Sequence, residues 1–313
     1  MSDKMYNEIK PFNEFWLDCY STAIYSILQS NYEVDKSVFY NNNYVYEHSE
    51  NVRTGMGRAY ITINLDSIMD KLFMSCETHD FTKEEDVVAK LKFYIDRKNI
   101  VSLGIDMFYG VPDTSQWRKH HINHNILVEG YDDSKQCVYV LETGENGYKE
   151  YLMSYDEITK AAKEFICFAR DTEIFEVNHD NVFFMVDKKD VINNAQIIVE
   201  SIDYLVSKVD SIWKVEPEKL LSMKDEIDSH IKSIRNRQEV NAKLFKELDK
   251  NGEYEKYITA FEGLRQKYHE LLIDIDKICI SGEYYLRETQ VKNTFKNYLN
   301  VEKNLWVEFM NEK

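Results

Sequence analysis

The chain has 313 residues, of which 43% are hydrophobic and 30% charged, a composition typical of a globular rather than a disordered protein. Its formal net charge is −16, with most of the excess acid in residues 1–190, and such a surface repels nucleic acid and anionic membranes and attracts cations. No apolar run approaches the roughly 18–20 residues that cross a bilayer, and the polar first residues do not resemble a signal peptide. We therefore expect a cytoplasmic protein that binds neither nucleic acid nor membrane.

Cysteine usage agrees with that compartment. The cysteines are odd in number, far apart and without a C-x-x-C pair: Cys19, Cys76, Cys137, Cys167 and Cys279. A disulfide framework or a structural zinc site would need closer, paired spacing. We therefore expect neither, and we expect no metal or other resident cofactor.

Residues 1–190 mix helix and strand signals. Between Asp18 and Ser30 the apolar residues recur at helical spacing: Tyr20, Ala23, Ile24, Ile27 and Leu28. Short runs rich in β-branched and aromatic residues follow at 100–108, 125–129, 137–141 and 182–186, and the segment 131–136 is typical of a hairpin turn. Helices followed by strands, with few prolines, predict an α+β domain over residues 1–190.

The second half of the chain has a different pattern. From about Val191, apolar residues step by three and four: Ile198, Ile202, Leu205, Val209 and Ile212, then Tyr257, Phe261, Leu264, Tyr268, Leu271, Ile275 and Ile278. Pro217 suits the first turn of a new helix, and Gly252 and Gly282 lie where helices would end. This pattern predicts a bundle of three or four long helices as a domain of residues 191–313.

Cys19 is the first candidate for chemistry. It follows Asp18, a suitable N-cap, and begins the predicted amphipathic helix. A thiol at a helix N-terminus lies at the positive end of the helix dipole, which stabilises its thiolate. The charge of Asp18 acts in the opposite direction, so a histidine partner would have to supply most of the activation. Taken alone, a cysteine on a helix is more often structural.

His124 and Glu142 are the second candidate pair. His124 begins a predicted strand, and Glu142 lies on the returning strand of the same hairpin. If the turn centres near Asp133, residue numbers across the hairpin sum to about 266, which places Glu142 opposite His124 on one face. A carboxylate there can hold the tautomer of the imidazole, as the third member of a catalytic triad does. A one-residue register error would substitute Thr143, and Glu145 is a further alternative.

Two weaker signals lie nearby. Asn13 precedes Cys19 by six positions, and its amide could donate a hydrogen bond to the oxyanion of a tetrahedral intermediate. His120, His121 and His124 form an H-H-x-x-H pattern, but no clear ligand set completes it, so we do not predict a zinc site.

These pieces together resemble a known family. N-x5-C followed by a helix is similar to the Q-x5-C start of papain-like enzymes, and HNILVEGYDD followed by VYVLE resembles their histidine strand, turn and aspartate strand. The intervening VSLGIDMFYGVPD…HHINH segment resembles the butirosin biosynthesis protein H-like N-terminal domain. The similarity covers about residues 10–170, and a helical C-terminal region is common in that family.

The resemblance implies a papain-like fold, with a helix that carries the cysteine and an antiparallel sheet that carries the histidine. It also implies acyl transfer in bacterial natural-product biosynthesis. In that family an acyl group passes from the phosphopantetheine thioester of an acyl or peptidyl carrier protein to an amine. Similar enzymes use a small diamine, an acceptor that suits an acidic domain.

Carried over residue by residue, the resemblance makes Cys19 the nucleophile, His124 the base and Glu142 the equivalent of the family's Asp. Asn13 takes the position of the oxyanion Gln. Glu for Asp lengthens the third side chain by one methylene, and Asn for Gln shortens the oxyanion donor by one. Tyr20 replaces the glycine that follows the nucleophile in the peptidases, which favours the transferases.

Two alternatives remain. The same site would serve a cysteine peptidase or hydrolase of the papain-like clan. In the other alternative the protein is a non-catalytic scaffold, with the heptads of residues 191–313 mediating homo-oligomerisation or docking of a carrier protein. Lys232, Arg235 and Arg237 are one candidate basic surface for such docking, although a solvated helix face is the more common role of such residues.

Overall fold

The structure of the chain is a computed structural model. It describes residues 4–15, 18–41, 43–50, 57–114, 116–144, 147–165, 172–180, 182–214, 220–281 and 284–312. Pro217 and Gly282, which we expected at helix boundaries, and Cys167 and Glu145 lie outside these residues. Within the described residues, no helix has both the length and the apolar character needed to span a membrane.

The chain forms two compact units that do not follow a single cut in the sequence. The sheet unit comprises Met1–Val34 and Asp66–Phe183, and the helical unit comprises Asp35–Leu65 and Phe184–Lys313. The expected division into residues 1–190 and 191–313 therefore differs from the structure, because the segment 35–65 is part of the helical unit. The expected α+β class, with an antiparallel sheet and a helical C-terminal region, is confirmed.

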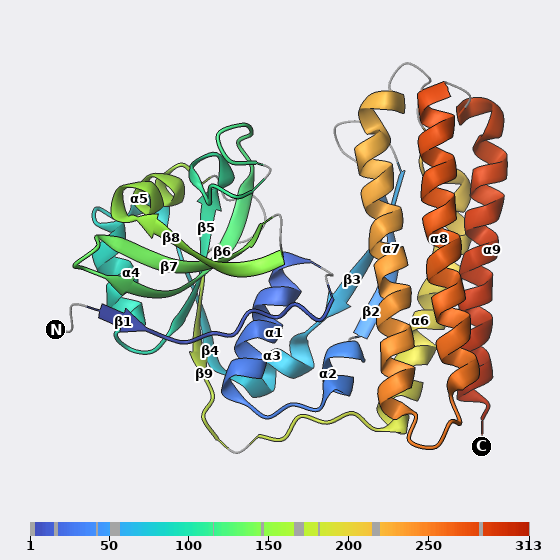
Figure 1. The fold of residues 1–313 in the computed structure, drawn as a ribbon, viewed down its shortest axis with the longest axis horizontal. Coiled ribbons are helices and arrows are strands. Elements are labelled where there is room, and N and C mark those ends of the chain that lie inside the picture. Colours follow the sequence, from blue (N-terminus) through green and yellow to red (C-terminus); the bar gives the residue numbers. More distant parts are fainter. Residues whose placement is uncertain are drawn as a thin grey trace. The chain divides into compact units, whose positions relative to one another are not determined.

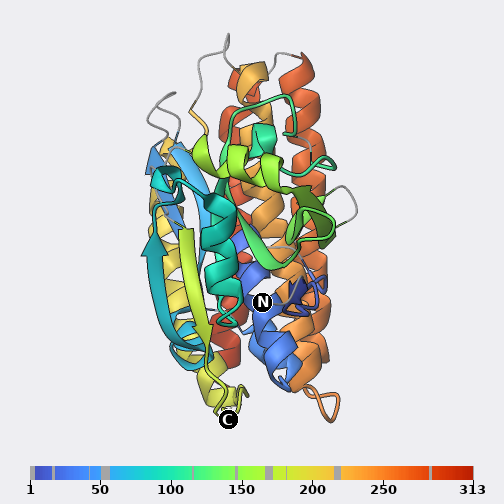
Figure 2. The ribbon, with the colours of Figure 1, turned by 90° about the vertical axis from the view of Figure 1, so that its left-hand side faces the viewer.

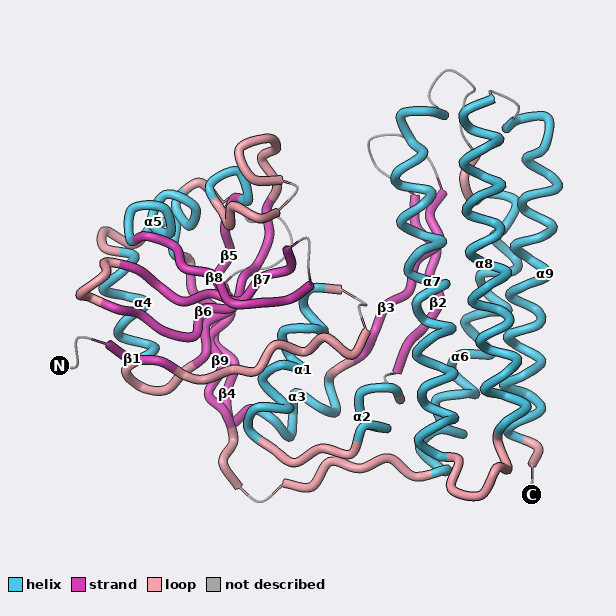
Figure 3. The backbone as a smooth tube through the Cα atoms, in the orientation of Figure 1, coloured by secondary structure: helices cyan, strands magenta, loops and turns pink. Residues whose placement is uncertain are grey.

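One antiparallel sheet organises the sheet unit (Figures 1 and 3). In sheet order, its described strands are β4 (Phe73–His79), β9 (Thr172–Val177), β5 (Ile100–Asp106), β6 (Asn123–Asp132), β7 (Cys137–Gly144) and β8 (Gly147–Ser154), and β1 (Lys4–Tyr6) pairs with β6. β5 is buried along its whole length, as its continuous apolar run predicts. The expected strand at 182–186 does not form: these described residues are mainly loop, and Phe183 and Met185 are exposed.

Helices cover the sheet and build its core. Helices α4 (Val87–Ile95) and α5 (Tyr155–Lys163) contribute Val87, Leu91, Ile158 and Ala161 to a buried cluster with β5, β6 and β7. Helix α1 (Cys19–Asn31) packs against β6 and β7, and α3 (Asp66–Leu72) against β4. The packing of α1 brings the start of that helix to the strands that carry His124 and Glu142.

The helical unit is a bundle of long helices with a hairpin attached. Helices α6 (Lys188–Lys208), α7 (Leu220–Leu248), α8 (Glu255–Ser281) and α9 (Tyr284–Met310) run alongside one another (Figures 1 and 2). The heptad residues of α6 and α8 are buried, as their spacing predicts. Gly252, between α7 and α8, has a φ of +79°, a conformation that favours glycine. A short helix, α2 (Lys36–Tyr40), and the hairpin of β2 (Asn43–Glu50) and β3 (Gly57–Asn64) complete the unit.

A buried polar network explains why the hairpin belongs to this unit. Glu302 of α9 is fully buried and accepts hydrogen bonds from the hydroxyls of Tyr44 and Tyr46 at 2.7 and 2.6 Å and from Nε2 of Gln238 at 2.7 Å. Burial raises the pKa of the Glu302 carboxyl. A buried carboxylate needs such hydrogen-bond partners. Because the partners of Glu302 lie on β2 and α7, these bonds join both elements to α9.

The same network corrects one expectation. Arg237, proposed from the sequence as part of a basic docking surface, is 1% exposed. Its guanidinium donates to the carbonyl of Tyr40 at 2.7 Å and to Oδ1 of Asn241 at 2.9 Å. Arg237 is therefore a core residue that holds α2 against α7 and cannot contribute to a surface formed with Lys232 and Arg235.

Candidate active site

Cys19 is the first residue of α1, at the position expected from the sequence. Asp18 caps the helix: its Oδ1 accepts the backbone N–H of Ser21 at 2.8 Å and its Oδ2 accepts the Ser21 hydroxyl at 2.6 Å. The carboxylate of Asp18 is thus engaged by the first turn of the helix. The N–H of Cys19, at the first helical position, has no carbonyl partner within the helix.

His124 and Glu142 lie together on β6 and β7, but not in the predicted register. The ladder pairs Leu127 with Leu141 and Val128 with Val140, so paired residue numbers sum to two more than expected. Continued along the strands, this register places Glu142 opposite position 126. Because the error is an even number of residues, Glu142 keeps the same face and reaches His124 as a diagonal neighbour.

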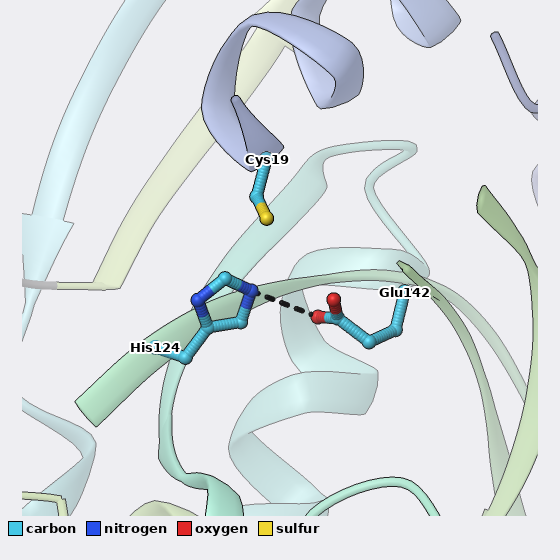
Figure 4. A group of neighbouring side chains, drawn as sticks. All are labelled: Cys19, His124 and Glu142. Carbon is cyan, nitrogen blue, oxygen red and sulfur yellow. Dashed lines mark ion pairs between the residues drawn. The ribbon is translucent and has the colours of Figure 1, made fainter. Parts of the chain in front are cut away.

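Three side chains from distant parts of the chain converge here (Figure 4). Oε2 of Glu142 lies 3.0 Å from Nε2 of His124. One ligand atom each from Cys19, His124 and Glu142 lies within 4.8 Å of the others, and Figure 4 shows the sulfur pointing toward the imidazole. The predicted nucleophile, base and carboxylate are therefore adjacent.

The surroundings of His124 change its protonation. Its side chain is 24% exposed and that of Glu142 is 3% exposed. Burial by itself lowers the pKa of His124, but the adjacent Cys19 sulfur and Glu142 carboxylate outweigh burial and raise it to about 10. At neutral pH the imidazole is therefore protonated when the sulfur beside it is ionised.

Thr143 completes the site and was not assigned a role from the sequence. Its backbone N–H donates to Oε1 of Glu142 at 2.6 Å, and its hydroxyl lies 4.0 Å from Sγ of Cys19. Sequence reasoning named Thr143 only as a substitute for Glu142 in a shifted register. The position of Thr143 directly after Glu142, the expected third member of the triad, could have identified it as a site residue.

The side chain of Asn13 forms hydrogen bonds with the backbone of β8. Its Oδ1 accepts the N–H of Tyr148 at 2.9 Å and its Nδ2 donates to the carbonyl of Tyr148 at 2.8 Å. In this structure the amide acts as a clamp on β8. The oxyanion role of Asn13 stays a prediction, and it would use the second hydrogen of Nδ2.

The other two histidines of the H-H-x-x-H pattern do not join His124. Nδ1 of His121 lies 2.6 Å from Oδ2 of Asp106, and its ring stacks on Phe108 at 4.4 Å; His120 is exposed. Within the described residues, the cluster of three His, Cys, Asp or Glu side chains with a spacing suited to a metal ion is Cys19, His124 and Glu142. These three could ligate a soft divalent cation such as Zn²⁺.

Comparison with protein-family models found no matching family, and comparison with curated proteins found no matching relative.

Proposed function

We propose that this protein is a papain-like acyltransferase that uses Cys19 to pass an acyl group from a carrier-bound thioester to an amine. The observation that carries the proposal is the convergence of a helix-terminal thiol, an imidazole and a buried carboxylate from α1, β6 and β7. Nucleophile, base and orienting acid within contact of one another are the arrangement that covalent acyl transfer needs.

In the first half-reaction the sulfur of Cys19 attacks the carbonyl carbon of the donor thioester. In the proposed reaction His124 accepts the thiol proton, so that the attacking sulfur is a thiolate. The oxyanion of the tetrahedral intermediate receives the N–H of Cys19 and a side-chain donor, with Asn13 as the predicted one. The donor C–S bond then breaks, and His124 gives its proton to the departing pantetheine thiolate, which leaves an acyl group on Cys19.

In the second half-reaction an amine attacks this acyl-enzyme. His124 accepts a proton from the amine nitrogen, the C–N bond forms, and the bond from the acyl carbon to Sγ breaks. The products are an amide and the regenerated pair of thiolate and imidazolium. Conversion of a thioester to an amide is downhill, so neither a nucleotide nor a cofactor is required.

Charge supports transfer to an amine over hydrolysis. The formal net charge of −16 draws a cationic acceptor, such as a small diamine, toward the protein. Tyr20, directly after the nucleophile, also departs from the glycine of the peptidases that the sequence resembles. A bacterial antibiotic pathway, with a carrier protein as donor, is the setting that this resemblance implies.

The test offers the protein straight-chain acyl pantetheine thioesters with 1,4-diaminobutane and follows all products by mass spectrometry. The expected result is the acyl diamine, an acyl adduct on Cys19 when the amine is omitted, and neither with Cys19→Ala. Free acid as the main product would instead assign the site to a hydrolase. An unmodified Cys19 that reacts with iodoacetamide no faster than free cysteine would contradict catalysis and favour a scaffold.

A further inference from the structure

A second group of side chains lies on the connection between β5 and β6. Phe108 and Tyr109, in a short 3-10 turn, have ring centroids 4.9 Å apart. The guanidinium carbon of Arg118 lies 5.8 and 5.7 Å from these two rings, and Nζ of Lys160 lies 4.4 Å from the ring of Tyr109. We call these four residues the aromatic–basic patch.

Backbone bonds hold the patch in place. The N–H of Met107 donates to the carbonyl of Ile122 at 2.8 Å and closes the base of the connection. The N–H of Arg118 donates to the carbonyl of Phe108 at 3.2 Å, which draws Arg118 back over the rings. Helix α5, which carries Lys160, packs against the same turn. The two cationic groups are thus positioned by the fold.

The two cations of the patch form no ion pair with the described residues, whereas some other cations of the sheet unit do. Elsewhere in the sheet unit, Lys92 pairs with Asp133 and Lys149 with Asp113. Within the described part of the chain, neither Arg118 nor Lys160 forms an ion pair, although both are exposed on a protein of net charge −16.

Two carboxylates near the patch, those of Asp106 and Glu157, are already engaged, whereas Asp156 and Glu164 lie one helical turn from Lys160 and are exposed. Asp106 lies 2.6 Å from His121 and accepts the N–H of Phe108, and Glu157 forms the capping box of α5 with Ser154. The patch therefore offers an anion two exposed cations, which the aromatic rings restrict while leaving their N–H groups accessible.

The patch lies close in the chain to the candidate base. Arg118 is six positions before His124, so the two backbones are separated by at most about 20 Å. That separation is of the same order as an extended pantetheine arm. A phosphate at the patch would leave the thioester end of such an arm within reach of the site.

We infer that the aromatic–basic patch binds the phosphate of the donor's phosphopantetheine arm while its thioester lies at Cys19. The inference rests on the proposed acyl transfer and adds the means of donor recognition. A guanidinium presents two parallel N–H groups that match two phosphate oxygens, and a nearby ammonium adds a second charge. Coenzyme A carries this phosphate as part of a diphosphate and a carrier protein carries it as a serine diester, so the patch recognises the phosphate position that the two donors share.

The experiment compares donors with and without this phosphate. The second-order rate of Cys19 acylation is measured by mass spectrometry with an acyl pantetheine and with the same acyl 4′-phosphopantetheine, and then with the coenzyme A and carrier-protein thioesters. Wild-type protein is expected to react about tenfold faster with the phosphorylated donor, and less so at high salt because exposed charges are screened.

The variants separate the patch from the rest of the surface. Arg118→Ala combined with Lys160→Ala should remove the preference for phosphate and leave the rate with acyl pantetheine unchanged, which also shows that the variant folds. Arg97→Ala is the matched control, because Arg97 likewise stacks on an aromatic ring, that of Phe93 on α4, at 3.4 Å but lies outside the patch. This variant should change neither rate.

Either of two results with the pantetheine donors would overturn the inference. They are equal rates with both donors in wild-type protein, and a preference for phosphate that survives in the double variant. A loss confined to the carrier-protein donor would move the patch from phosphate recognition to contact with the carrier's own surface, and would also overturn it. Failure of the proposed function looks different, because no donor would then acylate Cys19.

Discussion

The backbone N–H of Thr143 donates to Oε1 of Glu142 at 2.6 Å, while Oε2 of the same carboxylate lies 3.0 Å from Nε2 of His124. One oxygen is therefore fixed by the strand's own backbone and the other faces the imidazole. Because the Glu142 side chain is 3% exposed, its charge is poorly screened by water and acts strongly on His124. Variants of Glu142, His124, Thr143 and Cys19 therefore test separately the carboxylate, the imidazole, the hydroxyl and the sulfur of this arrangement.

Replacing the sulfur should abolish the reaction. Cys19→Ala is expected to lower acyl transfer by about a thousandfold or more, because members of a triad act as a unit. The melting temperature should stay close to that of the wild type, since Cys19 is only partly buried. Cys76→Ala is the control, because Cys76 is exposed and lies on β4. Equal activity of wild type and Cys19→Ala would end the catalytic assignment.

The charge of Glu142 should matter more than its size. Glu142→Gln keeps the volume but removes the negative charge that raises the pKa of His124. We expect a loss in kcat of about tenfold to a hundredfold and a fall in the pKa of His124, which NMR titration of the imidazole can follow. A histidine that still titrates near 10 in this variant would show that Glu142 does not set its charge.

The same pKa makes stability depend on pH. The pKa of His124 is raised from 6.5 to about 10 on folding, so the protonated imidazole stabilises the folded state. This contribution is complete below pH 6.5 and is lost as the pH rises through 10. Urea unfolding of the wild type and of His124→Gln at pH 6 to 10 should therefore show a difference in free energy of unfolding that shrinks with increasing pH. A difference independent of pH would contradict the shift.

The Thr143 hydroxyl should contribute to kcat. It lies 4.0 Å from Sγ, close enough to donate to the thiolate or to a developing oxyanion. Thr143→Val keeps the backbone N–H that holds Glu142, so it isolates the hydroxyl; we expect kcat to fall about tenfold with KM nearly unchanged. Thr143→Ser should restore the rate. Equal kinetics of the valine and serine variants would leave the hydroxyl without a function.

The role of the Asn13 amide can be determined by comparing the free energy of unfolding with kcat in two variants. Asn13→Ala removes two hydrogen bonds to the backbone of Tyr148 and should lower the free energy of unfolding by about 1 kcal/mol. Asn13→Asp keeps the acceptor for the N–H of Tyr148 and removes the donor. If kcat falls in both variants while stability is unchanged, Asn13 acts on the oxyanion and its clamp on β8 is unimportant.

Part of this site follows from the sequence alone. Helical spacing after Asp18 places Cys19 at a helix start, since a capping residue and an amphipathic period are local properties. Alternation along β6 and β7 places His124 and Glu142 on one face, and this holds even with the register wrong by two, because a strand's side chains repeat every second residue.

The remaining features depend on contacts between distant residues. The register of β6 and β7 changes between Val128 and Gly130, and an irregularity of this kind has no period to reveal it. The sequence analysis assigned no role to Tyr44 and Tyr46, whose hydroxyls donate to the buried Glu302, more than 250 positions away.

The sequence by itself determined which residue types begin the helix and line one face of the hairpin, because those are set by local periodicity. Only the tertiary structure decided that α1 packs against β6 and β7, which brings the sulfur to the imidazole. It also decided that Arg237 is buried while Arg118 is exposed and without an ion pair in the described residues. Packing sets the burial and charge environment of a side chain, and no short-range pattern encodes it.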